Sequence, residues 1–157
     1  MRILLAIDGS EFSDAALEQV AGRPWPEASQ VDILAVYEPP ALPTTDAWVL
    51  PQNYYDEMEK ASQEQARECV NRAVERLRAA PTKLQVNTEI ARGYPADVIL
   101  DRANRWGTDL IVVGSHGYSG LKRFLLGSVS LNVASHAHCS VEIVRVREKH
   151  EASKNDE

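Results

Sequence analysis

The sequence contains few cysteines and no long hydrophobic run, and each absence excludes a class of protein. Its two cysteines, Cys69 and Cys139, lack the spacing of a disulfide framework or a metal knuckle, so we expect both to be reduced packing residues. No apolar run is long enough to cross a membrane, and the apolar stretch at residues 3–7 is too short for the core of a signal peptide. These features predict a cytoplasmic protein.

Positive charge is also scarce. The chain has 17 lysines and arginines against 23 aspartates and glutamates, which gives a formal net charge of −6. This excess of negative charge disfavours nonspecific binding to nucleic acid or to anionic membranes, while a local basic patch is still able to hold a phosphate.

The chain does have enough apolar residues for a folded core. Of its 157 residues, 44% are hydrophobic, as is ordinary for one globular domain with a layered interior. We predict a single domain over residues 1–147, followed by a charged, disordered tail over residues 148–157.

Strand-like and helix-like segments alternate along this domain. The strand-like segments are residues 2–7, 31–37, 84–91, 109–113 and 141–146. Helical periodicity covers residues 11–21, 53–80, 95–106 and 129–137. The alternation predicts an α/β fold, a Rossmann-like, doubly wound, five-stranded parallel sheet in the order 3-2-1-4-5 with helices on both faces. The proline-rich segment 38–52 is a lid, a binding loop, a partner contact or a plain connector.

The most informative motif follows the fourth strand. Gly114-Ser115-His116-Gly117 is followed, after nine further residues, by Gly127-Ser128 at the start of the last helix. Glycines clear side chains from a loop whose amides can close around an anion, and a helix N-terminus favours phosphate. We expect a Cβ atom at Gly117 or Gly127 to crowd an approaching phosphate, and the hydroxyls of Ser128 and Ser130 to face it. A tight turn without a ligand is the simpler alternative for these glycines.

Asp8 ends the first strand, in the turn Asp8-Gly9-Ser10. In the predicted strand order, strands one and four flank the point where the order reverses, and ligands of such folds bind there. Asp8 and the loop at Gly114 are therefore expected to face each other across one crevice. The Asp8 carboxylate is an acceptor for ligand hydroxyl groups, a metal ligand, or only the cap of the next helix, for which Ser10 and Ser13 are also candidates.

Together these motifs resemble the universal stress protein family. The resemblance rests on the turn at Asp8, on the glycine pattern from Gly114 to Ser128, and on the ending His136-Ala137-x-Cys139-x-Val141. It spans residues 1–147, and the glycine pattern resembles that of the family's ATP-binding branch.

The resemblance implies a stress-response regulatory module that holds ATP or another adenine nucleotide, with Mg²⁺ on the phosphates. It places Asp8 at the adenosine, Val36 at the adenine, Gly114 beside the ribose and Gly117 at the phosphates. The implied nucleotide-binding residues are Ala6, Ile7, Asp8, Val36, Val113, Gly114, Gly117, Gly127, Ser128, Val129 and Ser130.

Family members commonly pair their final strands, so the resemblance implies a homodimer through residues 141–146, whose apolar edge needs a cover. Tyr118 stands where a basic residue often follows the second glycine, which leaves the preference among AMP, ADP and ATP open. Ser140 stands in place of the family's usual proline, which makes this turn less rigid.

Catalysis is the main alternative to binding. His116 lies inside the glycine loop and is a candidate base, although loop packing or a hydrogen bond beside the ligand is the simpler role. The phosphate loops of nucleotidyltransferases and ATP pyrophosphatases are missing, so we expect no catalytic residues and at most slow ATP hydrolysis. A stress protein that acts through protein contacts alone is the third possibility.

Two further groups are ambiguous. Lys122 and Arg123 lie between the glycine clusters and either neutralise a phosphate or face solvent. His136, His138 and Cys139 have donor atoms suited to a metal but lack a fourth ligand, which favours a structural role.

Overall fold

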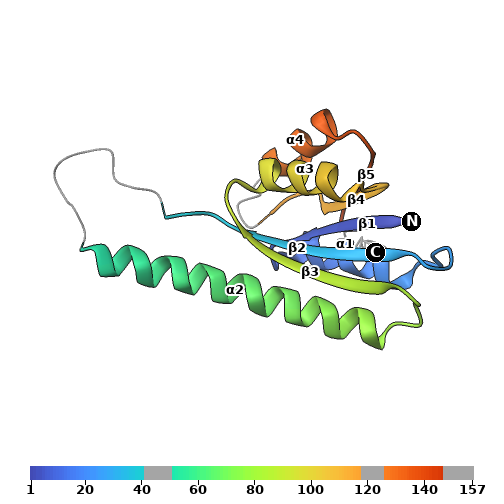
Figure 1. The fold of residues 1–157 in the computed structure, drawn as a ribbon, viewed down its shortest axis with the longest axis horizontal. Helices are drawn as coiled ribbons and strands as arrows, with labels where there is room; N and C mark the ends of the chain where they lie inside the picture. Colours follow the sequence, from blue (N-terminus) through green and yellow to red (C-terminus); the bar gives the residue numbers. More distant parts are fainter. Residues whose placement is uncertain (41–50, 118–125, 147–157) are drawn as a thin grey trace, which may run out of the picture.

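The computed structural model describes residues 1–40, 51–117 and 126–146 of the chain. Its strands are β1 (Arg2–Ile7), β2 (Gln30–Tyr37), β3 (Gln85–Arg92), β4 (Leu110–Gly114) and β5 (Ser140–Val144). They form one sheet in the order β3-β2-β1-β4-β5, and every neighbouring pair runs parallel (Figure 1). The predicted α/β architecture and strand order are therefore confirmed.

Helices cover both faces of this sheet. On one face lie α1 (Glu11–Gly22) and α2 (Gln52–Ala79), and on the other lie α3 (Pro95–Trp106) and α4 (Ser128–His136) (Figure 1). Alternate residues of β1 enter different cores: Ile3 packs on the side of α1 and α2, whereas Leu4 packs with residues of α3 and α4. A central parallel strand reads as a continuous apolar run because both of its faces are buried.

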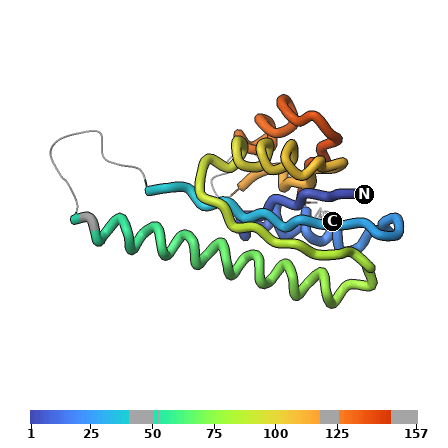
Figure 2. Tube along the Cα trace, in the orientation of Figure 1, coloured from blue at the N-terminus to red at the C-terminus, as the bar shows by residue number. Residues whose placement is uncertain are grey.

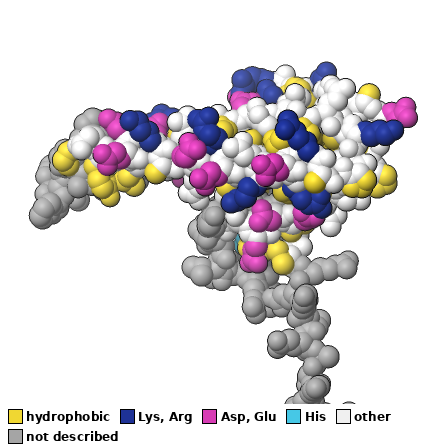
Figure 3. Space-filling model, turned by 90° about the horizontal axis from the view of Figure 1, so that it is seen from below, with side chains coloured by type: hydrophobic (Ala, Val, Ile, Leu, Met, Phe, Trp, Pro, Cys, Tyr) yellow, Lys and Arg dark blue, Asp and Glu magenta, His cyan; other side chains and the backbone are white. Residues whose placement is uncertain are grey.

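The long helix α2 confirms its predicted apolar stripe, because Ala66, Val70, Ala73 and Leu77 are all buried. Cys69 joins them, and burial raises the pKa of its thiol, which keeps this residue neutral and apolar. These contacts all lie in the C-terminal half of α2, and the N-terminal half extends beyond the sheet (Figure 2). Acidic and basic side chains are interspersed over the surface that faces the viewer in Figure 3.

The remaining differences from the predicted elements are shifts of one or two residues at their ends. The last strand ends at Val144 instead of residue 146, and Val146 is exposed. Such shifts are usual where helices and strands fray. Residues 41–50 of the proline-rich segment and residues 147–157 of the predicted tail lie outside the described residues. Across the described ranges, we find no helix with the length and apolar character needed to span a membrane.

Candidate functional site

A cavity of about 270 Å³ opens where the carboxyl ends of β1 and β4 meet the start of α4. All eleven residues predicted for the nucleotide site line it: Ala6, Ile7, Asp8, Val36, Val113, Gly114, Gly117, Gly127, Ser128, Val129 and Ser130. The expectation that two distant segments share one crevice is confirmed by this geometry.

The other lining residues are Ser13, Leu34, Pro95, Ile99 and His116. Of these, the sequence had singled out His116 as a candidate beside the ligand and Ser13 only as a possible helix cap. Leu34 could have been found from Val36, since alternate residues of a strand share a face. Pro95 and Ile99 come from α3. Their position beside β2 depends on how that helix packs on the sheet, and no local sequence pattern predicts this packing.

The two walls of the cavity touch at Asp8 and Gly117. A Cβ atom built on Gly117 would lie 2.7 Å from Oδ2 of Asp8, which is closer than real Cβ contacts allow. The other carboxylate oxygen, Oδ1, accepts a hydrogen bond of 2.9 Å from the backbone N–H of Ser10. Asp8 thus braces its own turn with one oxygen and faces the glycine loop with the other.

The cap of α1 is Ser10 and not Asp8. The N–H of Ser13 donates to Oγ of Ser10 over 3.2 Å, and Ser13 in turn accepts from the N–H of Gly9 over 3.1 Å. Of the three roles predicted for Asp8, helix capping is therefore wrong. Its carboxylate borders the cavity, where it can accept from a ligand or ligate a metal.

The glycines are needed because protein segments approach one another closely. A Cβ on Gly114 would lie 2.6 Å from the carbonyl carbon of Phe12, and one on Gly127 would lie 3.2 Å from Cα of His116. We expected glycine at 117 and 127 to keep space for a phosphate, and that expectation stays a prediction; the close approach of the chain's own atoms is a separate reason for glycine here. None of Gly114, Gly117 and Gly127 has a left-handed backbone, so a positive φ is not what requires glycine at these positions.

Ser130 holds the two glycine segments together. Its side chain is buried, and Oγ donates to the carbonyl oxygens of Ser115 at 2.9 Å and of Gly127 at 3.0 Å. Gly127 also donates its N–H to the Ser115 oxygen at 2.8 Å. Oγ of Ser130 therefore has two backbone acceptors within the loop, and the expectation that this hydroxyl faces a phosphate stays a prediction.

The start of α4 presents unpaired backbone amides at the cavity. Gly127 is the N-cap, and within the described ranges no side chain caps this end. The first helical hydrogen bond runs from the N–H of Leu131 to the oxygen of Gly127, so the amides of Ser128, Val129 and Ser130 precede the helical ladder. Ser128 is exposed at the cavity. Amides and dipole together make this end suitable for an anion.

His116 packs within the loop. Its ring centroid lies 5.0 Å from that of Phe12, and Nδ1 lies 3.1 Å from Oγ of Ser115. These contacts are those of the predicted packing role, and they leave the ring on the cavity wall.

The lining falls into two groups of different chemistry. We call Leu34, Val36, Pro95 and Ile99, which come from β2 and α3, the apolar end of the cavity, and Asp8 with the α4 start its polar end. Among the described lining residues Asp8 is the one carboxylate, and none is a lysine or arginine. Tyr118, Lys122 and Arg123 lie outside the described residues.

The predicted alternative of a metal site at the end of α4 gains no geometric support. Nδ1 of His136 lies 2.9 Å from the carbonyl oxygen of Asn132, and burial raises the pKa of the Cys139 thiol. Where the structure describes the chain, no three His, Cys, Asp or Glu side chains converge to hold a metal ion.

Comparison with known proteins places this geometry in a family. Residues 1–145 match the model of the universal stress protein family. The universal stress protein YxiE of Bacillus subtilis is 36% identical over 147 residues, which cover 92% of this chain and 98% of that relative.

Solved structures agree. UspA from Lactobacillus plantarum shares the fold, with a TM-score of 0.78 at 24% identity over 92% of this chain and 97% of that one. A universal stress protein in complex with cAMP matches with a TM-score of 0.66 at 26% identity, over 92% of this chain and 96% of that one. The chain described here belongs to the universal stress protein family.

Proposed function

We propose that the cavity binds an adenine nucleotide, with ATP as its ligand, and that the protein is a cytoplasmic, nucleotide-dependent regulatory module of the stress response. The observation that carries this proposal is the meeting of Asp8 with the glycine loop and the uncapped α4 start around one cavity. Support also comes from the related universal stress protein in complex with cAMP, which has 26% sequence identity to this chain.

The two ends of the cavity suit the two ends of a nucleotide. A planar base fits the apolar end, between Leu34 and Val36 of the sheet and Ile99 of α3. Phosphate oxygens fit the α4 start, where the amides of Ser128 and Val129 are not used by the helix. Asp8 lies beside both segments and is suited to accept from ribose hydroxyls.

A triphosphate brings more negative charge than the described lining can balance. The α4 start contributes roughly half an elementary charge, and Asp8 is itself negative. We therefore propose that ATP binds with Mg²⁺. Magnesium keeps several waters and binds through one or two carboxylates plus phosphate oxygens. Asp8 supplies such a carboxylate at the cavity, so the residues present fit the ion, which would neutralise phosphate charge.

Thermal unfolding tests the proposal directly. A ligand at 100 times its Kd stabilises a folded protein by about 2.7 kcal/mol if it does not bind the unfolded chain. We expect AMP and ATP to raise the Tm, and Mg²⁺ to increase the effect of ATP more than that of AMP. Absence of a shift with every adenine nucleotide would refute the proposal. Product formation within minutes would instead show a dedicated enzyme.

The proposal includes a homodimer formed through residues 141–146. In the described sheet β5 pairs with β4 on one side only, so its other edge is open to a second copy. Sedimentation analysis at micromolar concentration tests this part. A monomer at all concentrations would refute the dimer without affecting the nucleotide site.

A further inference from the structure

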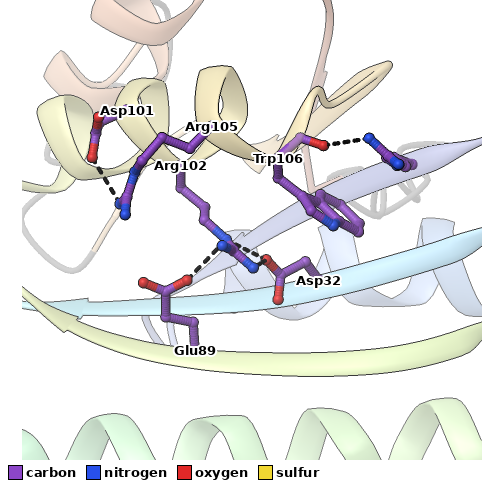
Figure 4. A network of polar contacts seen from close by, with 7 residues as sticks. Asp32, Glu89, Asp101, Arg102, Arg105 and Trp106 are labelled. Carbon is purple, nitrogen blue, oxygen red and sulfur yellow. Dashed lines mark hydrogen bonds and ion pairs between the residues drawn. The ribbon is translucent and has the colours of Figure 1, made fainter.

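A network of charged side chains lies next to the apolar end of the cavity. Arg102 of α3 reaches the sheet and donates from Nε to Oδ2 of Asp32 at 2.6 Å (Figure 4). The same Nε lies 2.8 Å from Oε2 of Glu89. We call Asp32, Glu89 and Arg102 the Arg102 network. Asp32 is fully buried, and its other oxygen has no hydrogen-bond partner within the described ranges.

This network continues the wall of the cavity. Asp32, Leu34 and Val36 alternate along β2 and so share a face, and the last two line the cavity. Glu89 of β3 is the register partner of Leu34. On α3, Arg102 lies three positions after Ile99, which is the neighbouring position on the same side of a helix. Arg102 therefore connects the two surfaces that face each other across the apolar end.

The remaining attachments of α3 at this end are packing contacts. Ile99 and Ala103 are buried, and Ala96 and Val98 are half-buried against the same core cluster. The C-terminal end of the helix is held by Arg2, whose Nη1 donates to the carbonyl oxygen of Trp106 at 2.7 Å. At the cavity end, Pro95 follows an N-cap that forms no side-chain hydrogen bond. Within the described residues, the ion pairs of Arg102 are the charged interactions that join the middle of α3 to the sheet.

We propose that Arg102 is a positioning residue: it sets the separation between α3 and β2, and thereby how tightly the apolar end encloses a base. The inference rests on the proposed function, because it assigns the base of the nucleotide to this end. An ion pair with a buried carboxylate suits this task, since its charge-assisted hydrogen bonds are short and directional and add to the packing contacts of α3. The phosphate end, built from the β4 loop and α4, does not include the network.

The test must separate positioning from stability. Removing Arg102 alone leaves Asp32 charged and buried, so that variant is expected to unfold easily. The double variant Asp32→Val/Arg102→Met replaces the pair with apolar side chains, an exchange that is often neutral for folding. The matched control is Asp101→Val/Arg105→Met, which removes the exposed ion pair on the same helix.

The ligands are AMP and ribose 5-phosphate, which lacks the base. We expect the folded double variant to bind AMP about tenfold more weakly, a loss of about 1.4 kcal/mol. Its affinity for ribose 5-phosphate should stay within about twofold, and the control variant should bind both as the wild type does. Unchanged AMP affinity, or an equal loss for both ligands, would overturn the positioning role.

If the wild type binds neither ligand, that result refutes the proposed function alone. The positioning role is then tested by hydrogen exchange in the absence of nucleotide. In the double variant, the amides of Val98 and Ile99 should exchange faster, while those of β4 stay unchanged. Equal exchange in both proteins would overturn the proposal. If the double variant does not fold, Glu89→Gln is compared with the wild type instead. This change keeps the pair of Asp32 and Arg102 and weakens only the contact of Arg102 with the half-exposed Glu89.

Discussion

Gly117 lies so close to Asp8 that a single added carbon would meet the carboxylate, with 2.7 Å between Cβ and Oδ2. The two residues stand at opposite walls of the cavity and come from turns more than a hundred positions apart. Their close approach leaves no room for a side chain at position 117.

Gly117→Ala should therefore force the Asp8 carboxylate to turn and weaken its hydrogen bond from the Ser10 N–H, which lowers the free energy of unfolding by about 0.5–1.5 kcal/mol. Combining it with Asp8→Ala removes the carboxylate that the new methyl group meets, so the double variant should lose less than the sum of the two single changes. Urea unfolding of all four proteins gives the coupling. Additive losses would show that the methyl group finds space elsewhere.

Ser128→Asp separates folding from binding. A carboxylate in the first turn of α4 is favourable to the helix dipole and should leave stability unchanged or raise it by about 0.3–1 kcal/mol. The same charge repels a phosphate at that helix start, and affinity for AMP should fall roughly tenfold. Titration calorimetry measures the fall.

The matched control is Asn132→Asp, which adds one negative charge to an exposed position of the same helix, outside the cavity lining. Its AMP affinity should stay close to that of the wild type. If both variants lose affinity equally, the effect reflects net charge and not the helix start.

Ser130→Ala should cost about 0.5–1.5 kcal/mol, because the buried hydroxyl donates to two carbonyl oxygens. Ser135→Ala is a matched comparison on the same helix, since its exposed hydroxyl donates to Leu131 at 2.8 Å. That change should have little effect on the free energy of unfolding. Chemical denaturation distinguishes the two, and equal losses would argue against a special role for Ser130.

Arg102→Met should destabilise the protein by about 3–5 kcal/mol, since it leaves the fully buried Asp32 without its cation. Arg105→Met breaks an ion pair of 2.8 Å whose side chains are about 60% exposed, and should cost less than about 1 kcal/mol. Thermal or urea unfolding compares them. A small loss at Arg102 would mean that water reaches Asp32.

Much of this fold was predictable because its local signals agree with one another. The apolar strand at residues 2–7 needed cover on both faces, and the helix pattern between each pair of strands supplied it. The strand order then brought Asp8 beside the Gly114 loop. Position along the chain was enough to name these lining residues.

Side-chain partners were harder to predict. No local pattern predicts that the hydroxyl of Ser130 donates to the carbonyl oxygen of Ser115, whose direction depends on the folded loop. Asp32 and Arg102 are ordinary charged residues in the sequence, and only the packing of α3 across β2 makes them a pair. Such contacts depend on three-dimensional distance and leave no periodic signal.

The peptide of Ser115 has a consequence for how the protein tolerates change. Its N–H donates to Val144 at the end of β5, and its oxygen accepts from Gly127. One residue thus joins the end of β5 to the N-cap of α4, directly after β4. A substitution that turns its backbone would shift the outer strand and the start of the helix together, so its effect would reach well beyond position 115.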